Sequence, residues 1–161
     1  MKGPCKILSV MALIGVLISA CSWVGTIPSN SEFDVWVADS VKHCGEGVCT
    51  IRLSELTPFD WNQMYVFPIG FTPDDVNNVV KTTVPFRQEF SRKIVFLKGD
   101  VVVHTDENRP DLETMLPQEV FFSDDKDKQS YYVFPKSALF SVERKKLDVG
   151  EYYELKCVNC G

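Results

Sequence analysis

The sequence predicts an α+β fold: an antiparallel sheet of about six to seven strands, with two short helices in the first half of the chain. Two observations support this class. Apolar side chains recur at helical spacing in residues 32–42 and 73–82. From Arg92 onward, short β-branched and aromatic runs are separated by turn residues. Because no internal repeat or low-complexity tract divides the chain, we expect one globular domain over residues 32–161.

Residues 1–20 have the composition of an export signal. Lys2 and Lys6 supply positive charge, and no acidic residue occurs before Glu32. Residues 7–18 form an apolar run interrupted only by a serine. This run has the length of a signal-peptide core and is shorter than the ~20 residues that a helix needs to span a bilayer.

Ile18-Ser19-Ala20-Cys21 ends this run and resembles the lipobox of bacterial lipoproteins. The resemblance covers only the leader and Cys21. It implies that residues 1–20 are a lipoprotein signal peptide, that the Cys21 thiol carries a diacylglyceryl group, and that the new N-terminus is acylated. The alternatives are an ordinary secretory leader with a chance cysteine, and an uncleaved anchor.

The residues after Cys21 indicate where the domain would lie. In enteric lipoproteins an aspartate after the lipidated cysteine favours the inner membrane. Ser22 therefore implies the periplasmic face of the outer membrane, in a source that has two membranes. Residues 21–31 are rich in Gly, Pro, Ser and Asn and are expected to form a lipidated linker. Ten residues of flexible coil span roughly 16–19 Å, so the domain would stay near the bilayer.

Composition limits the choice of partner. The leader holds two of the 17 basic residues and none of the 22 acidic ones, so the mature chain carries a formal charge of −7. An acidic chain without a basic cluster argues against nucleic acid and against anionic lipid headgroups as ligands. The lipid anchor is therefore the predicted membrane contact, and no cofactor is expected.

Four cysteines remain once Cys5 is removed with the leader and Cys21 is lipidated. They are Cys44, Cys49, Cys157 and Cys160. An even number of cysteines in an exported domain predicts two disulfides, and the local pairs are favoured over crossed pairing because each closes a short loop. A four-thiolate zinc site, with His43 as a substitute ligand, fits the spacing but not an oxidising compartment.

Cys157-Val158-Asn159-Cys160 also has the spacing of a thioredoxin-type redox pair. Such a pair depends on a lowered thiol pKa, which usually comes from a helix N-terminus after the first cysteine. Only Gly161 follows here, so a structural disulfide is favoured.

The first predicted helix covers residues 32–42, with Ser31 as its N-cap. Its apolar face consists of Phe33, Trp36, Val37 and Val41. This face is expected to pack into the core rather than to form a groove for a partner.

The second predicted helix covers residues 73–82. Thr72 is its N-cap, Pro73 occupies the first helical position, and Asp74 and Asp75 face the positive end of the helix dipole. This structural role accounts for the paired aspartates, so we do not interpret them as catalytic.

The strands are expected to be short. Early strands are predicted at residues 49–53 and 64–67. Residues 94–97 and 101–103 predict a hairpin around Lys98-Gly99-Asp100, and both runs are apolar on both faces, which is typical of the middle of a sheet. A second hairpin is predicted from residues 119–122 and 130–134, and strands at 138–143 and 152–157 complete an antiparallel series.

Phe59-Asp60-Trp61 followed by Tyr65-Val66-Phe67 forms the pattern F-D-W-x-x-x-Y-V-F. Together with the hairpin at residues 94–103, this segment resembles a group of small bacterial proteins of unknown function, several of them predicted lipoproteins. The resemblance covers most of the mature domain loosely. It implies no activity, because none is attached to the group.

Candidate catalytic residues are few. His104-Thr105-Asp106 lies at a strand end, where a solvated hairpin rim is the favoured interpretation. No G-x-S-x-G or H-E-x-x-H pattern occurs. The segment at residues 124–128 lacks the spaced oxygen ligands of a calcium loop. We therefore predict no catalytic residue and no metal ligand.

Adjacent aromatic residues occur at three places: Phe121-Phe122, Tyr131-Tyr132 and Tyr152-Tyr153. Neighbouring side chains on a strand point to opposite faces, so one member of each pair is expected to point away from the other. If the outward members share a face, that face could bind a partner protein or a glycan. A second core layer is the alternative.

These observations predict a non-enzymatic, membrane-anchored envelope lipoprotein that binds another protein in an accessory, inhibitor or immunity role. The alternative is a thiol–disulfide redox or metal-binding envelope protein that uses Cys157 and Cys160 with Cys44 and Cys49.

Overall fold

The computed structural model describes residues 31–42, 44, 47–86, 90–109, 118–123, 131–148 and 150–160. The predicted leader, Cys21, His43 and residues 124–128 lie outside these ranges. Within them the chain forms eight strands and three helices, an α+β arrangement dominated by sheet. None of the helices in these ranges is long and apolar enough to cross a bilayer.

The strands form two four-stranded sheets in place of the single sheet of six to seven strands that the sequence predicted. The first sheet has the order β1-β7-β8-β5, formed by Val48–Arg52, Leu139–Leu147, Gly150–Cys157 and Val120–Ser123. The second has the order β4-β3-β2-β6, formed by Val101–Asn108, Arg92–Lys98, Gln63–Phe67 and Tyr132–Pro135. Neighbouring strands are antiparallel except β5 and β8, which are parallel.

The two predicted helices are confirmed. Helix α1 (Glu32–Val41) begins at Ser31, whose side chain accepts a hydrogen bond from the Asp34 N–H at 3.1 Å. Helix α3 (Pro73–Val80) begins at Thr72, which forms a capping box with Asp75. A further helix that the sequence did not predict, α2 (Leu53–Leu56), makes a single turn directly after β1.

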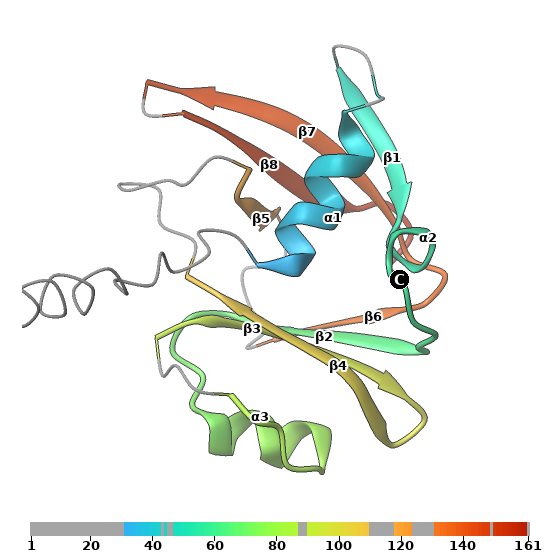
Figure 1. Ribbon diagram of the computed structural model, residues 1–161, viewed down its shortest axis with the longest axis vertical. Coiled ribbons are helices and arrows are strands. Elements are labelled where there is room, and N and C mark those ends of the chain that lie inside the picture. The colour runs from blue at the N-terminus through green and yellow to red at the C-terminus, as the bar shows by residue number, and fades with distance from the viewer. Residues whose placement is uncertain are drawn as a thin grey trace, which may run out of the picture.

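The second sheet carries packed side chains on both of its faces. In Figure 1, α1 lies on one side of this sheet and α3 on the other. The main core fills the space between the two sheets and α1, and its largest fully buried side chains include Trp61, Phe33, Phe96 and Phe140. A smaller core between α3 and the second sheet contains Phe67, Val76, Val80, Val84, Val95 and Leu97. Helix α1 therefore lies where the main core would otherwise be open.

The predicted hairpin of residues 119–122 and 130–134 is wrong. Strand β5 pairs with β8 in the first sheet, while β6 pairs with β2 in the second. The two strands meet through side chains: the rings of Phe122 and Phe134 stack with their centroids 5.8 Å apart. Burial of these rings between the sheets takes the place of the expected backbone pairing.

The hairpin at residues 94–103 is confirmed, but only one of its strands lies in the middle of a sheet. Strand β3 lies between β4 and β2, and six of its seven residues are buried. Strand β4 is at the end of the sheet order, and its residues after Val101 are half-buried. On one face of β4, His104 packs against Trp36 of α1, and on the other face Val102 packs against the smaller core.

Candidate functional site

Cys44, Cys49, Cys157 and Cys160 form two local disulfides, as predicted. Cys44 is bonded to Cys49 with a Cα–Cα distance of 5.9 Å, and Cys157 to Cys160 with 5.7 Å. All four side chains are partly buried against the main core. Within the ranges that the structure describes, no group of three or more His, Cys, Asp and Glu side chains is arranged to hold a metal ion.

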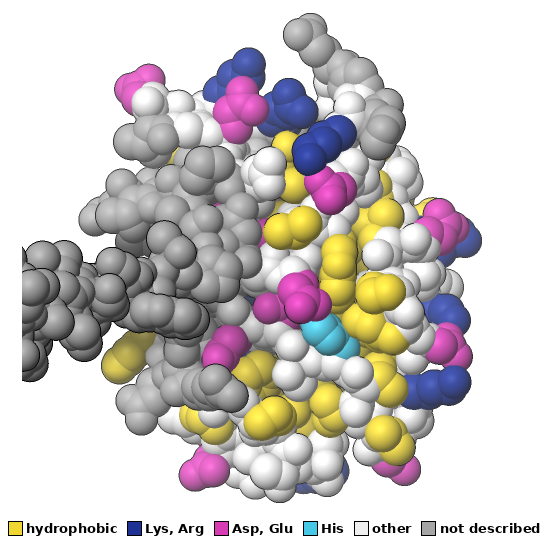
Figure 2. Space-filling view, viewed as in Figure 1, with side chains coloured by type: hydrophobic (Ala, Val, Ile, Leu, Met, Phe, Trp, Pro, Cys, Tyr) yellow, Lys and Arg dark blue, Asp and Glu magenta, His cyan; other side chains and the backbone are white. Residues whose placement is uncertain are grey.

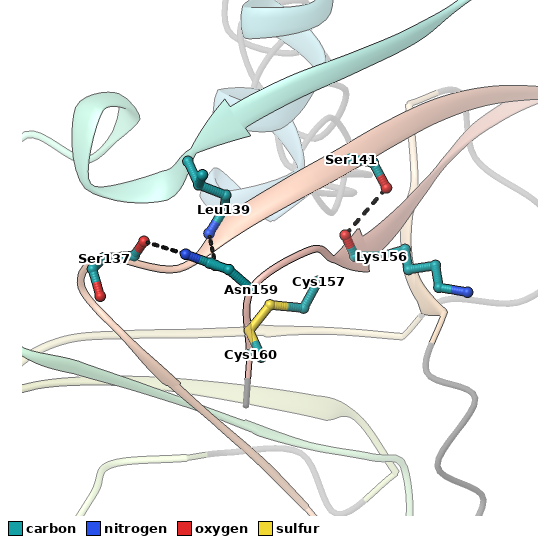
Figure 3. Close-up of a disulfide and its surroundings, with 7 residues drawn as sticks. All are labelled: Ser137, Leu139, Ser141, Lys156, Cys157, Asn159 and Cys160. Atoms are coloured by element: carbon teal, nitrogen blue, oxygen red, sulfur yellow. Dashed lines mark hydrogen bonds between the residues drawn. A yellow bond between two sulfur atoms is a disulfide. The ribbon is translucent and has the colours of Figure 1, made fainter.

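The Cys157–Cys160 loop is tied to the beginning of β7. Asn159 Oδ1 accepts a hydrogen bond from the Leu139 N–H at 2.7 Å, and Asn159 Nδ2 donates to the Ser137 carbonyl at 3.4 Å (Figure 3). The Val158 N–H donates to the Leu139 carbonyl at 2.8 Å. These hydrogen bonds hold the disulfide-closed loop at the end of β8 against the beginning of β7.

A buried polar network joins α1 to the second sheet and to the beginning of β5. Asp34 and Arg92 form an ion pair of 3.0 Å, with side chains 0% and 6% exposed. Asn108 also donates to Asp34, and Arg92 donates to the Val120 carbonyl. The Arg92 guanidinium lies 5.4 Å from the centroid of the Phe122 ring. Arg92 therefore links α1, β3 and β5.

Burial shifts the pKa values of this network. Desolvation raises the pKa of Asp34, and the positive charge of Arg92 opposes this. Desolvation also raises the pKa of Asp106, whose carboxylate accepts a hydrogen bond from the Phe33 N–H at 2.7 Å. Asp106 thus caps the beginning of α1 from the neighbouring strand β4.

Asp106→Asn is expected to change how stability depends on pH. The pKa of the Asp106 carboxyl is higher in the folded state than in the unfolded chain, so protonated Asp106 stabilises the folded state. This contribution is fully present below the unfolded-state pKa of about 3.8. This stability is lost as the pH rises through the folded-state pKa. The variant keeps an oxygen that can accept from Phe33 and loses the titration. Urea unfolding from pH 4 to 7 should therefore show that the variant gains stability relative to wild type as the pH rises. A difference that stays constant with pH would contradict this.

Asp60 and Trp61 of the F-D-W segment contact side chains from neighbouring turns. The Trp61 indole N–H donates to Thr57 Oγ1 at 2.9 Å, and its ring is 1% exposed. Asp60 forms ion pairs with Lys98, at 2.9 Å, and with Lys136. Hydrogen bonds from Lys136 and Lys98 lower the pKa of Asp60 to about 2. Because Lys98 ends β3, Lys136 follows β6, and both strand ends pair with Gln63 at the beginning of β2, Asp60 joins β3 to β6 at one end of the second sheet.

Phe59 belongs to a half-buried group that we call the aromatic cluster, formed by Trp36, Phe59, Phe96 and His104. The Phe59 ring stacks on the His104 imidazole with centroids 4.7 Å apart. Trp36 lies 5.7 Å from Phe59 and 5.3 Å from His104. Phe96 is fully buried beneath them, whereas the other three members are only partly buried. The rings are thus joined in one continuous set of contacts.

The aromatic cluster lies on a mixed surface. In Figure 2 the imidazole of His104, the one histidine in the described ranges, lies beside a belt of apolar side chains and next to acidic ones. His104 Nε2 is buried, has no hydrogen-bond partner among the described residues, and lies 3.7 Å from Glu32 Oε2. The sequence favoured a solvated rim at His104-Thr105-Asp106. Instead, His104 and Asp106 both contact α1.

The adjacent aromatic pairs do not form one shared face. Phe122, Tyr132 and Tyr153 pack against the main core. Phe121 and Tyr152 contact each other on the opposite face of the first sheet, with centroids 5.2 Å apart. Tyr131 packs with Phe67 on the far side of the second sheet. Pairing of β5 with β8 and of β6 with β2 separates these outward rings.

A pocket of about 480 Å³ lies between the end of α1 and strands β1, β7 and β8. Its buried lining includes Val41, Val142 and Tyr153, and its exposed lining includes Lys42 and Lys146. The size suits a small molecule. Both lysines already pair with acids, Lys42 with Asp39 at 2.6 Å and Lys146 with Glu151 at 3.4 Å. The charged groups around the pocket thus favour no particular class of ligand.

The chain matches no protein-family model, no curated protein and no solved structure.

Proposed function

We propose that the protein is a non-enzymatic lipoprotein of the cell envelope, anchored through Cys21, that binds another protein with the face around α1. In a source with two membranes, Ser22 favours the periplasmic side of the outer membrane. The lipobox-like Ile18-Ser19-Ala20-Cys21 supports the anchor. The two disulfides suit an oxidising compartment.

The aromatic cluster is the observation that carries the binding proposal. Trp36 and Phe59 lie half-exposed on one face, next to Val35, whose side chain is 40% exposed. Tryptophan is among the residues that contribute most to binding energy at protein interfaces.

Three titratable groups of the network around α1 have a structural role that accounts for them without catalysis. Asp34, Arg92 and Asp106 contact one another, the backbone or neighbouring amides. Each of these contacts joins α1 to another element. Their shifted pKa values therefore have a structural cause.

Site-specific photo-crosslinking in intact cells tests the proposal. A photoreactive residue at Val35 is expected to capture one specific envelope protein. The matched control is Ile69, which is 47% exposed in the segment between β2 and α3. Recovery of the same abundant envelope proteins from both positions would overturn the binding proposal.

The competing hypothesis is thiol–disulfide exchange or metal binding by the four cysteines. The partial exposure of Cys157 and Cys160 is the feature that favours it. A thiol count under denaturing conditions after mild reductant separates the two. Two disulfides that resist mild reductant would remove the redox hypothesis, and purified protein without stoichiometric metal would remove the metal hypothesis.

A further inference from the structure

Glu32 differs from the other acids of α1 and of residues 53–60, each of which pairs with a lysine or an arginine. Asp34 pairs with Arg92, Asp39 with Lys42 at 2.6 Å, Glu55 with Arg52 at 3.3 Å, and Asp60 with Lys98 and Lys136. Within the described ranges, the ion-pair partner of Glu32 is an imidazole, at 3.7 Å. An imidazole compensates a carboxylate only when it is protonated. The charge of Glu32 therefore lacks a permanent counterion among these residues.

The half-buried rings of Trp36 and Phe59 differ from two other aromatic rings of the described ranges in having no cation over them. The Arg92 guanidinium lies over Phe122, and that of Arg144 lies 5.9 Å from the Tyr153 ring. Lysine and arginine side chains in the described part of the chain make no such contact with Trp36 or Phe59. Within the described ranges, these two rings therefore have no lysine or arginine over them.

The carboxylate and the rings lie close enough to act together. Glu32 and Trp36 are four residues apart on α1, so their side chains lie on the same face of the helix. His104 contacts both of them, and Phe59 stacks on His104. A side chain that reaches this point would meet an anion and aromatic surfaces at once.

We infer that Glu32, Trp36 and Phe59 form a cation site, which receives an arginine or lysine side chain from a basic segment of the partner protein. The inference rests on the proposed function and names the chemistry of its partner. Arginine suits the site best, because its planar guanidinium both stacks on aromatic rings and pairs with a carboxylate. The mature charge of −7 would also attract a basic partner from a distance.

Titration with hexa-arginine, with hexa-glutamate as the negative probe, tests the inference on mature lipidated protein in non-ionic micelles. The Trp36 indole N–H signal, assigned with Trp36→Phe, is followed by NMR. Hexa-arginine is expected to shift this signal saturably. Glu32→Gln should weaken its affinity roughly fivefold. Hexa-glutamate should leave the signal unmoved.

Glu55→Gln is the matched control, because Glu55 is as exposed as Glu32 (67% against 70%) but has its own arginine. It should change the affinity less than twofold. If both variants weaken hexa-arginine binding equally, the effect is general electrostatic attraction to an acidic protein, and the inference is overturned. A Trp36 signal that hexa-arginine does not shift would also overturn it. If Val35 still captures a specific partner and Glu32→Gln leaves that capture unchanged, the cation site fails while the proposed function stands.

Discussion

Arg92→Met is expected to lower the free energy of unfolding by about 3–5 kcal/mol, the typical cost of breaking a buried ion pair by removing one partner. Arg92 is 5% exposed. The variant would leave Asp34, Asp106 and Glu119 without the positive charge of the guanidinium. The variant would also lose the hydrogen bond to the Val120 carbonyl. Equilibrium unfolding in urea measures the change.

Arg52→Met is the matched control for this prediction. Arg52 pairs with Glu55 at 3.3 Å, but these side chains are 45% and 67% exposed. Removal of such an exposed pair should cost less than about 1 kcal/mol. If Arg92→Met does not fold, the double variant Asp34→Ala with Arg92→Met tests the same point, because replacement of both charges should restore part of the stability. Equal losses for Arg52 and Arg92 would contradict the role given to the network.

Cys21→Ala should abolish processing to a lipid-anchored protein. Without the thiol no diacylglyceryl group can be added, so the domain is released or the uncleaved precursor accumulates. Fractionation of cells, with and without detergent, followed by immunoblotting distinguishes these outcomes. Cys5→Ala is the matched control, because Cys5 lies in the leader outside the lipobox-like segment and should leave processing and attachment unchanged. A Cys21→Ala protein that is still processed and still needs detergent for release would exclude a lipid on Cys21.

Local signals predicted the elements whose structure depends on near neighbours. Ser31 and Thr72 are the N-caps of α1 and α3, and the turn at Gly99 closes the β3–β4 hairpin. The local pairing of the cysteines is confirmed for the same reason, because each disulfide closes a short loop.

The division into two sheets could not be predicted in this way. The run at residues 119–123 is a plausible partner for any nearby strand, and it pairs with β8, more than thirty residues further along the chain. The strand with which it pairs depends on contacts between aromatic rings across the core, such as the contact between Phe122 and Phe134. Such contacts form only when both sheets are assembled.

The candidate site was missed because its residues have ordinary local explanations. Asp34 in the first turn of a helix predicts an interaction with the helix dipole, and only the fold places it against Arg92, 58 residues later. Trp36 belongs to the predicted apolar face of α1, yet it remains half-buried while Phe33 and Val37 are fully buried. A useful signal was His104 itself: the sequence placed it at a strand end, whereas it lies within β4 at the centre of the aromatic cluster.

Intact-mass spectrometry of the protein, extracted from membranes with detergent, tests the central claim most directly. The claim is that a lipid-anchored, disulfide-bonded domain begins at Cys21. The predicted mass is that of residues 21–161 with a diacylglyceryl group and an acyl chain, less four hydrogens for the two disulfides. A chain that begins elsewhere, an unmodified Cys21, or four thiols that react with an alkylating agent without reductant would contradict it.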